Sequence, residues 1–352
     1  MSDLNTLAPD NRDLSMFPGE YGLPFLGKTV EFVKDTLAMC NKHYEKYGPV
    51  SRLDMVKNQR VLMCLGPEFN EAALFDPKGN FSVAGGYASS LGGLYPDGML
   101  TRDDAKHKRT RRASQPAFKN DALKTYVDML IPIQERRIQD LPINEEFIFY
   151  DNIQKTLMDV AARVFIGLDE LSPEAKKLGH LFSEINEGLI TPLPYDLPFL
   201  QFRKSLKARE ELRQFFIENI PKRRGSNGLD MFTRYCNAKD EDGEYLDDID
   251  IDGHIAFLLF AAFDTTTSAL TNILYYLGKN PEWQDKVRNE IFSVTNEMPT
   301  FEDLAEMNLT EYVFQETLRF YPSVMVLNRR TTRDVNVAGY DIPANTVVMI
   351  SP

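Results

Sequence analysis

The segment 255–270 combines an apolar helix pattern with one carboxylate and a run of hydroxyl side chains. Its first half is apolar on every side, which predicts a helix that is buried all round. Asp264 falls in this helix, and a buried carboxylate is costly unless it is paired or hydrated. Thr265 is placed to hydrogen-bond to the carbonyl of Ala261, which bends a helix, and the small Ala261 and Ala262 leave room beside it. An acid beside an alcohol in a dry groove predicts a proton relay. The alternative is a core helix whose hydroxyl groups are satisfied by the backbone.

A second helix pattern begins at Asn308, with Glu311 three residues later, and ends at Pro322. Glu316 falls on the apolar stripe of this helix, and a glutamate on a buried face needs a partner. Arg319, three residues on, is placed to be that partner. The alternative is an exposed ion pair that contributes almost nothing, and the apolar stripe argues against it.

A third pattern is basic. Thr101 and Asp104 predict the start of a helix in the capping-box manner. His107 and Arg111 are four residues apart and share one face of that helix, so their two donors can grip an anionic group such as a carboxylate. The other basic residues of 102–112 predict a positive patch on an otherwise acidic protein. A solvated basic helix is the alternative.

The bulk properties restrict the class of protein. The formal net charge of −12 argues against general nucleic-acid affinity and favours solubility. The three cysteines, Cys40, Cys64 and Cys236, are too few and too scattered for a disulfide framework or a zinc site. Residues 1–20 contain neither the apolar region of a signal peptide nor a run long enough for a membrane anchor, which predicts a cytoplasmic protein.

The remaining patterns predict a mainly α fold with a small β-sheet side region, an α+β class, in a single domain with a flexible lead-in at residues 1–17. Helix patterns predominate from about 68 to 291 and over 30–47. Two strands joined by a polar turn, a first hairpin, are predicted at 50–53 and 60–65. Near the end of the chain, a short hairpin is predicted at 335–337 and 339–340, followed by a strand at 346–350. Loops are predicted at 81–98, 225–228 and 240–252.

In this order, the three patterns resemble those of the cytochrome P-450 family over essentially the whole chain. Residues 261–266 resemble its oxygen-activating helix, with Ala262 where glycine is usual, and residues 316–319 resemble its ExxR motif. Arg329, five residues before Asp334, is similar to the arginine that meets a haem propionate.

His107 with Arg111 is similar to the propionate-binding pair of this family, with His where many members have Trp. The resemblance therefore implies that haem b is bound by His107, Arg111, Ala261, Thr265 and Arg329. It implies that Asp264 brings protons in and that Thr265 holds water at the iron, so these two are the catalytic residues. Glu316 and Arg319 would be structural and lock the core near the haem.

The function implied is a monooxygenase that hydroxylates a lipophilic small molecule with O₂ and two electrons. The electrons would come ultimately from NAD(P)H through a ferredoxin or flavodoxin docked on the basic helix 102–112. The substrate pocket would be lined from 81–96, 184–200, 257–263 and 324–327, in a monomer without a membrane anchor. A haem-dependent isomerase or dehydratase of the same fold and a non-catalytic helical binding protein are the alternatives.

One departure from the family concerns the iron. The family binds iron through a cysteine thiolate in a glycine-containing loop well beyond the ExxR helix, and no cysteine follows Cys236 here. The resemblance implies that the axial cysteine lies beyond residue 352 and that this chain is a C-terminally truncated fragment. Without the thiolate that favours O–O cleavage, we expect weak haem binding and no turnover.

Overall fold

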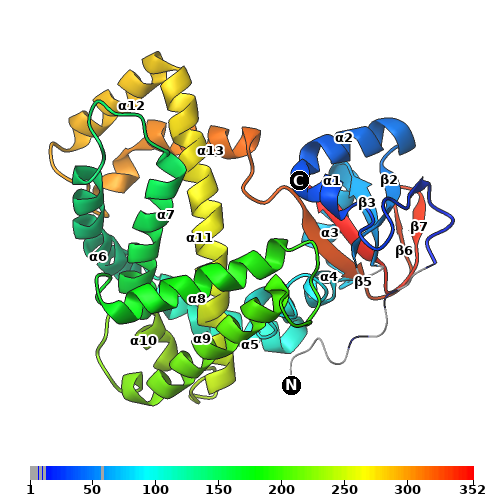
Figure 1. The fold of residues 1–352 in the computed structure, drawn as a ribbon, viewed down its shortest axis with the longest axis horizontal. Helices are drawn as coiled ribbons and strands as arrows, with labels where there is room; N and C mark the ends of the chain where they lie inside the picture. The colour runs from blue at the N-terminus through cyan, green and yellow to red at the C-terminus, as the bar shows by residue number, and fades with distance from the viewer. Residues whose placement is uncertain (1–6, 8–9, 11–12, 57–58) are drawn as a thin grey trace. The chain divides into compact units, whose positions relative to one another are not determined.

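The computed structural model describes residues 7, 10, 13–56 and 59–352. They form two compact units, which we treat separately. The first unit comprises the described residues of Met1–Lys108 together with Ser183–Glu211 and Val324–Pro352, and the second comprises Arg109–Phe182 and Leu212–Ser323. Figure 1 shows the sheets within the first unit and the long helices of the second. The prediction of a mainly α fold with a small sheet region is confirmed.

The first unit is built on a six-stranded sheet whose two faces are both covered. Successive residues of one strand point to opposite faces, so Val61 and Met63 pack with one core cluster while Leu62 and Cys64 pack with another. The predicted hairpin is antiparallel, with Val50 opposite Cys64. The strand order is β1 (Gly19–Glu20), β2 (Val50–Asp54), β3 (Arg60–Leu65), β8 (Val347–Ser351), β5 (Leu327–Thr331) and β4 (Phe81–Ser82), and β6 (Val335–Val337) pairs separately with β7 (Tyr340–Ile342).

The helices near the N-terminus differ from the prediction in one place. The predicted helix 30–47 is two helices, α1 (Thr29–Lys34) and α2 (Thr36–Tyr47), because Asp35 is extended and its carboxylate accepts a hydrogen bond from the Ala38 amide at 2.9 Å. Most of the predicted lead-in 1–17 lies outside the described residues. Leu14 and Phe17 are buried in the core beside the sheet, so this end of the segment is packed.

The predicted loop 81–98 contains β4 and a short helix, α4 (Val83–Tyr87), followed by turns and by η3 (Met99–Thr101). Asp103 holds α4 in place, since its Oδ1 accepts hydrogen bonds from the amides of Val83 at 3.0 Å and Ala84 at 3.2 Å. Gly86 has no room for a side chain, because a Cβ there would lie 2.7 Å from the Arg329 Cα. Ser82 also caps the helix locally, since its Oγ accepts a hydrogen bond from the Gly85 amide at 2.7 Å. The helix was missed because glycines in the segment favoured a loop prediction.

The second unit is helical, as predicted. Its longest helix, α11, lies beside α7. A π-helix, η5, continues α7 without a break. Three helices, α5, α8 and α9, cross the boundary between the units. The elements are α3 (Pro67–Phe75) in the first unit, then α5 (Asp104–Ser114), η4 (Gln115–Phe118), α6 (Asn120–Gln139), α7 (Phe149–Val160), η5 (Ala161–Ile166), α8 (Pro173–Ile190), α9 (Gln201–Arg223), α10 (Met231–Cys236), α11 (Asp248–Lys279), α12 (Pro281–Val294), η6 (Asp303–Glu306) and α13 (Asn308–Phe320).

The predicted loop 225–228 joins α9 to α10, whereas the predicted loop 240–252 ends at Asp247, because α11 begins at Asp248. Residues 250–257 of α11 are all buried, although 250–252 were predicted to be loop. In the apolar half of 255–270, which was predicted to be buried all round, Leu258 and residues 260–262 are only half-buried, so that prediction holds in part. Among the described helices, α11 alone is long and apolar enough to cross a membrane, a property it shares with core helices of soluble proteins.

Candidate active site

The hydroxyl group of Thr265 makes the predicted bond within α11. Its Oγ1 donates to the Ala261 carbonyl at 2.7 Å, which fixes the hydroxyl one turn from a small side chain. The Thr265 carbonyl accepts a hydrogen bond from the Ser323 Oγ at 2.9 Å. Thr267 and Thr271 bond to the carbonyls four residues earlier in the same way, so backbone satisfaction of these hydroxyl groups is also observed.

The prediction of a buried Asp264 is wrong: this residue is exposed, while Phe263 before it is buried. Since α11 is covered on all sides only in its first half, a polar residue in its second half can reach the surface. Nearby protein atoms still desolvate the Asp264 carboxyl enough to raise its pKa above the usual value. Tyr150 of α7 lies near it, and its pKa is raised first by burial and then by the charge of Asp264.

The Glu316–Arg319 pair forms with good geometry but on an exposed face. Arg319 donates two parallel hydrogen bonds to the carboxylate, from Nε at 2.7 Å and from Nη2 at 2.8 Å. The side chains are 57% and 64% exposed, so the prediction that the pair lies on a buried stripe is wrong. The residue of α13 that is buried is Thr317, one position away, because α13 packs on α11 and α12 through its Leu309–Val313–Thr317 side.

The predicted capping boxes do not form at either helix. At the start of α13, the amides of Leu309 and Thr310 donate to the carboxylate of Glu290 at 2.6 and 2.8 Å, and this carboxylate belongs to α12. Before α5, the Thr101 hydroxyl donates to backbone carbonyls, including that of Tyr95 at 3.0 Å. The start of α13 at Asn308 was predicted correctly, and Glu290 supplies its hydrogen bonds, whereas α5 begins at Asp104, three residues after Thr101.

The basic helix α5 carries fewer free charges than its sequence suggests. Arg109 pairs with Asp240 at 2.7 Å and Arg112 pairs with Glu241, both within the second unit. Arg102 is buried and therefore contributes nothing to a surface patch. Arg111 is exposed and makes no ion pair with another described residue. His107, one turn earlier on α5, falls in the first unit, whereas Arg111 falls in the second.

Arg329 lies on β5 in the first unit and is half-buried. Its Nη1 donates to the Asn328 carbonyl at 2.9 Å and its Nε to the Ala73 carbonyl at 3.3 Å. These two bonds fix the direction of the guanidinium group. A fixed, half-buried arginine suits an anionic partner such as a propionate, as does the exposed Arg111.

The cysteines do not suit a metal ion. All three are buried as free thiols, and burial raises the pKa of Cys40 and brings those of Cys64 and Cys236 to about 12. A thiol must lose its proton to bind iron, and burial in apolar surroundings opposes this. The arginines therefore fit the acidic groups of haem, but no cysteine of this chain fits its iron.

Comparison with known proteins identifies the family. The family description Cytochrome P-450 matches residues 17–352. The chain belongs to the cytochrome P-450 family. It is 29% identical to cytochrome P-450 136 of Mycobacterium tuberculosis, over 98% of this chain and 70% of that relative. It is 26% identical to the taxoid 14-beta-hydroxylase of Taxus cuspidata (95% and 70%) and 27% identical to the beta-amyrin 11-oxidase of Glycyrrhiza uralensis (95% and 71%).

The fold agrees with this assignment. The solved structure of retinoic acid-bound cyanobacterial CYP120A1 superposes with a TM-score of 0.85 at 27% identity, covering 95% of this chain and 76% of that one. Membership of the P-450 family implies haem iron as the cofactor, and the hydroxylase and oxidase relatives support a monooxygenase in general.

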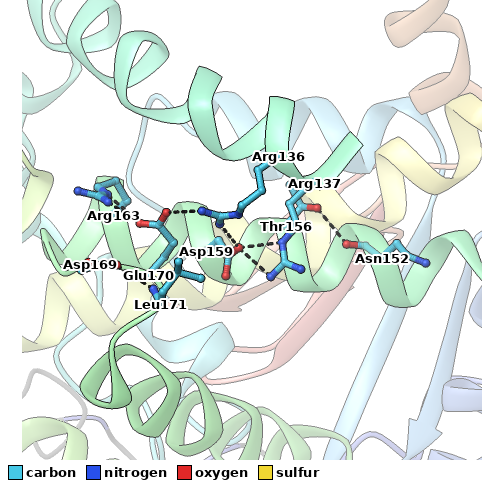
Figure 2. Close-up of polar contacts among 9 residues, drawn as sticks. All are labelled: Arg136, Arg137, Asn152, Thr156, Asp159, Arg163, Asp169, Glu170 and Leu171. Atoms are coloured by element: carbon cyan, nitrogen blue, oxygen red, sulfur yellow. Dashed lines mark hydrogen bonds and ion pairs between the residues drawn. The ribbon is translucent and has the colours of Figure 1, made fainter. Parts of the chain in front are cut away.

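An ion network in this P-450 was missed by the sequence reasoning. Asp159 accepts hydrogen bonds from Arg136 and Arg137, and Glu170 accepts from Arg136 and Arg163, all at 2.7–2.9 Å. Figure 2 shows Arg136 between the two carboxylates. Asp159 and Glu170 are buried acids, which is the usual sign of such a network, but their partners lie at a sequence separation that no helical spacing indicates.

Proposed function

We propose that this chain supplies the oxygen-activating helix and haem contacts of a monooxygenase that hydroxylates a lipophilic small molecule. The observation that carries the proposal is the hydroxyl of Thr265, held on the Ala261 carbonyl, directly after a carboxylate of raised pKa. Because Asp264 is exposed, it can take protons from water and pass them toward Thr265. Thr265 then holds the proton-carrying water at a fixed atom, its Oγ1.

We assign the haem propionates to His107, Arg111 and Arg329, and the space beside the ring to Ala261 and Thr265. Haem, when bound, supplies the chemistry of dioxygen activation. Two observations support the arginines: Arg111 is exposed and without an ion pair among the described residues, and Arg329 is fixed by two backbone carbonyls. Glu316 and Arg319 are assigned a structural role in the haem-loaded protein.

The substrate is proposed to be a hydrocarbon-rich isoprenoid. The relatives named above act on a taxoid and on beta-amyrin, and CYP120A1 binds retinoic acid, so all three ligands are of this class. Two of the segments predicted to line the pocket do meet within the first unit, where the Tyr95 hydroxyl donates to the Asn186 side chain at 3.0 Å. Their apolar composition suits such a ligand.

Electrons are proposed to come from NAD(P)H through a ferredoxin or flavodoxin that docks on α5. The exposed basic side chains of α5 are Lys108, Arg109, Arg111 and Arg112. To bind acidic groups of the donor, Arg109 and Arg112 would have to release Asp240 and Glu241. We further propose that the protein is a cytoplasmic monomer.

The first test measures haem binding by the 352-residue chain. Haem is added with and without an excess of a small alkyl thiol, and the spectrum is recorded after reduction under CO. Because the three cysteines are buried and protonated, we expect a thiolate-type Soret band only with the added thiol. Such a band from the chain alone would contradict our assignment of the cysteines. Since we expect this chain to bind haem only weakly, a non-catalytic binding protein would be favoured if neither sample took up haem at an excess of haem large enough to reveal weak binding.

The second test follows oxygen. The haem-loaded, thiol-supplemented chain is given retinoic acid, reduced ferredoxin and ¹⁸O₂, and the product is analysed by mass spectrometry. One ¹⁸O atom per product supports a monooxygenase, whereas a product without ¹⁸O would favour an isomerase or dehydratase. Thr265→Ala should lower the rate about 100-fold. Thr271→Ala is the matched control, because it removes the same kind of hydrogen bond from the same helix.

A further inference from the structure

A small apolar cavity lies within the second unit, among α7, η5, α8, α9 and α11. It leaves about 20 Å³ for the centre of a water-sized sphere, which is room for one small molecule. Every lining residue is apolar, and several of them, including Leu178, Leu212 and Leu259, are buried. The cavity is partly open to its surroundings, and Met158 and Ala161 in its wall are only half-buried.

The cavity has a local cause in the chain. The π-helix η5 follows α7 directly, and each of its turns holds about one residue more than an α-helical turn. It presents Ala161 and Ala162 to the cavity. Opposite them, α8 contributes Ala175 and Gly179. A Cβ at Gly179 would lie 3.1 Å from the Met158 Cγ, so the Met158 side chain of α7 occupies the space beside Gly179. The small side chains next to this contact leave the space unfilled.

The outer side of η5 is held by the ion network of Figure 2. Asp159 precedes the π-helix, Arg163 lies in it and Glu170 follows it, and Arg136 bridges the two acids. The π-helical geometry, and with it the cavity, is therefore fixed by charged contacts on one side and by apolar packing on the other.

The lining decides what the cavity can bind. A water molecule needs two to four polar partners, and the lining offers none from its side chains, so water is disfavoured. An apolar molecule of similar size loses no hydrogen bonds on entry and gains dispersion contacts. Leu259 of α11 forms part of the cavity wall. Phe182, which also lines the cavity, contacts Phe263 of α11 edge to face, with ring centroids 5.5 Å apart, and Phe263 lies two residues before Thr265.

We propose that this cavity is a binding site for a small apolar gas, with dioxygen as its occupant. The existence of the site follows from the cavity alone, whereas the choice of dioxygen rests on the proposed monooxygenase function. The site would hold dioxygen in contact with the helix that carries Thr265. No chemical change of the gas takes place there.

Xenon and dioxygen are the probes, added under pressure to the 352-residue chain with ¹³C-labelled Leu, Ile and Val methyl groups. We expect the methyl resonances of Leu178, Leu212 and Leu259 to shift saturably with xenon and to relax faster under dioxygen. The methyl groups of Leu62 and Val348, in the packed core beside the sheet, should change only weakly and linearly.

Ala175→Val should fill the cavity and weaken xenon binding at least about tenfold. Ala122→Val is the matched control, since Ala122 is a buried helical alanine that does not line the cavity. If Ala175→Val fails to fold, Leu178→Ala tests the same point by enlarging the cavity, and it should strengthen the xenon response.

Equal responses at the lining and control methyl groups would overturn the site. A saturable response to xenon without local relaxation by dioxygen would overturn the choice of occupant. Neither measurement involves haem or turnover, so a failure here is distinguishable from a failure of the proposed function.

Discussion

Two sets of arginine–carboxylate pairs in the second unit share the same chemistry but differ in burial. The acids Asp159 and Glu170 have side chains only 11% and 5% exposed, while Glu316 is 57% exposed. Arg319 binds Glu316 with two hydrogen bonds as short as those of the buried network. The two sets therefore have similar hydrogen-bond lengths, and they differ in how exposed the carboxylate is.

The difference matters because a charge is costly only where water has been removed. In the buried network, each acid has lost its water and depends on the arginines, so removing one partner leaves an uncompensated charge. In the exposed pair, water replaces the lost partner at once. We therefore expect the Glu316–Arg319 pair, which has the recognisable ExxR spacing, to stabilise the chain less than the network of Asp159 and Glu170 around η5.

The largest effect is expected for Glu170→Gln, which leaves Arg136 and Arg163 without their shared acid. We expect a loss of about 2–3 kcal/mol in the free energy of unfolding, below the full cost of breaking a buried pair because the arginines are partly exposed. Urea denaturation measures it. Asp169→Asn is the control, since Asp169 is the exposed neighbour. Equal effects of the two changes would contradict the comparison.

The same network predicts a dependence on pH. Burial raises the pKa of Glu170, but hydrogen bonds from Arg136 and Arg163 outweigh it, so the pKa lies below the ordinary value of 4.5. The contribution of the Glu170 charge to the free energy of unfolding is complete above pH 4.5, the ordinary pKa. It is lost as the pH falls from there through the lower pKa of the folded state. The stability difference between wild type and Glu170→Gln should therefore shrink on acidification below 4.5. A difference that stays constant down to pH 3 would show that charge is not the cause.

The charge of Asp264 should change the stability with pH in the opposite direction to that of Glu170, and by a smaller amount. Desolvation raises its folded pKa above 3.8, so its charged form destabilises the fold once the pH exceeds the folded pKa. Asp264→Asn should slightly raise the denaturation midpoint at pH 7 and leave it unchanged near pH 3. Asp151→Asn, a change of the same type at an exposed position of the same unit, is the control. A lower midpoint at pH 7 would show that Asp264 has an attractive partner.

These residues also show what the sequence could predict. The helical fold, the two hairpins and the Thr265–Ala261 hydrogen bond follow from local periodicity and from four-residue spacing, and all are observed. Burial of Asp264 and of the Glu316–Arg319 pair was predicted from apolar neighbours and is wrong, because coverage of a helix face depends on which elements pack against it. The Asp159–Glu170 network joins α6, α7 and η5 and has no local signal.

The smallest effect is expected for the exposed pair. Glu316→Gln removes the acceptor of both Arg319 hydrogen bonds, yet we expect no measurable change in the urea midpoint of the 352-residue chain. Arg319 keeps its water and its contact with the Phe320 ring at 4.2 Å, so no uncompensated charge is left. Arg319→Gln serves as the reciprocal change, and a double-mutant cycle isolates the pair itself. A coupling energy comparable to that of Arg136 with Glu170 would show that bidentate geometry, and not burial, sets the strength of these contacts.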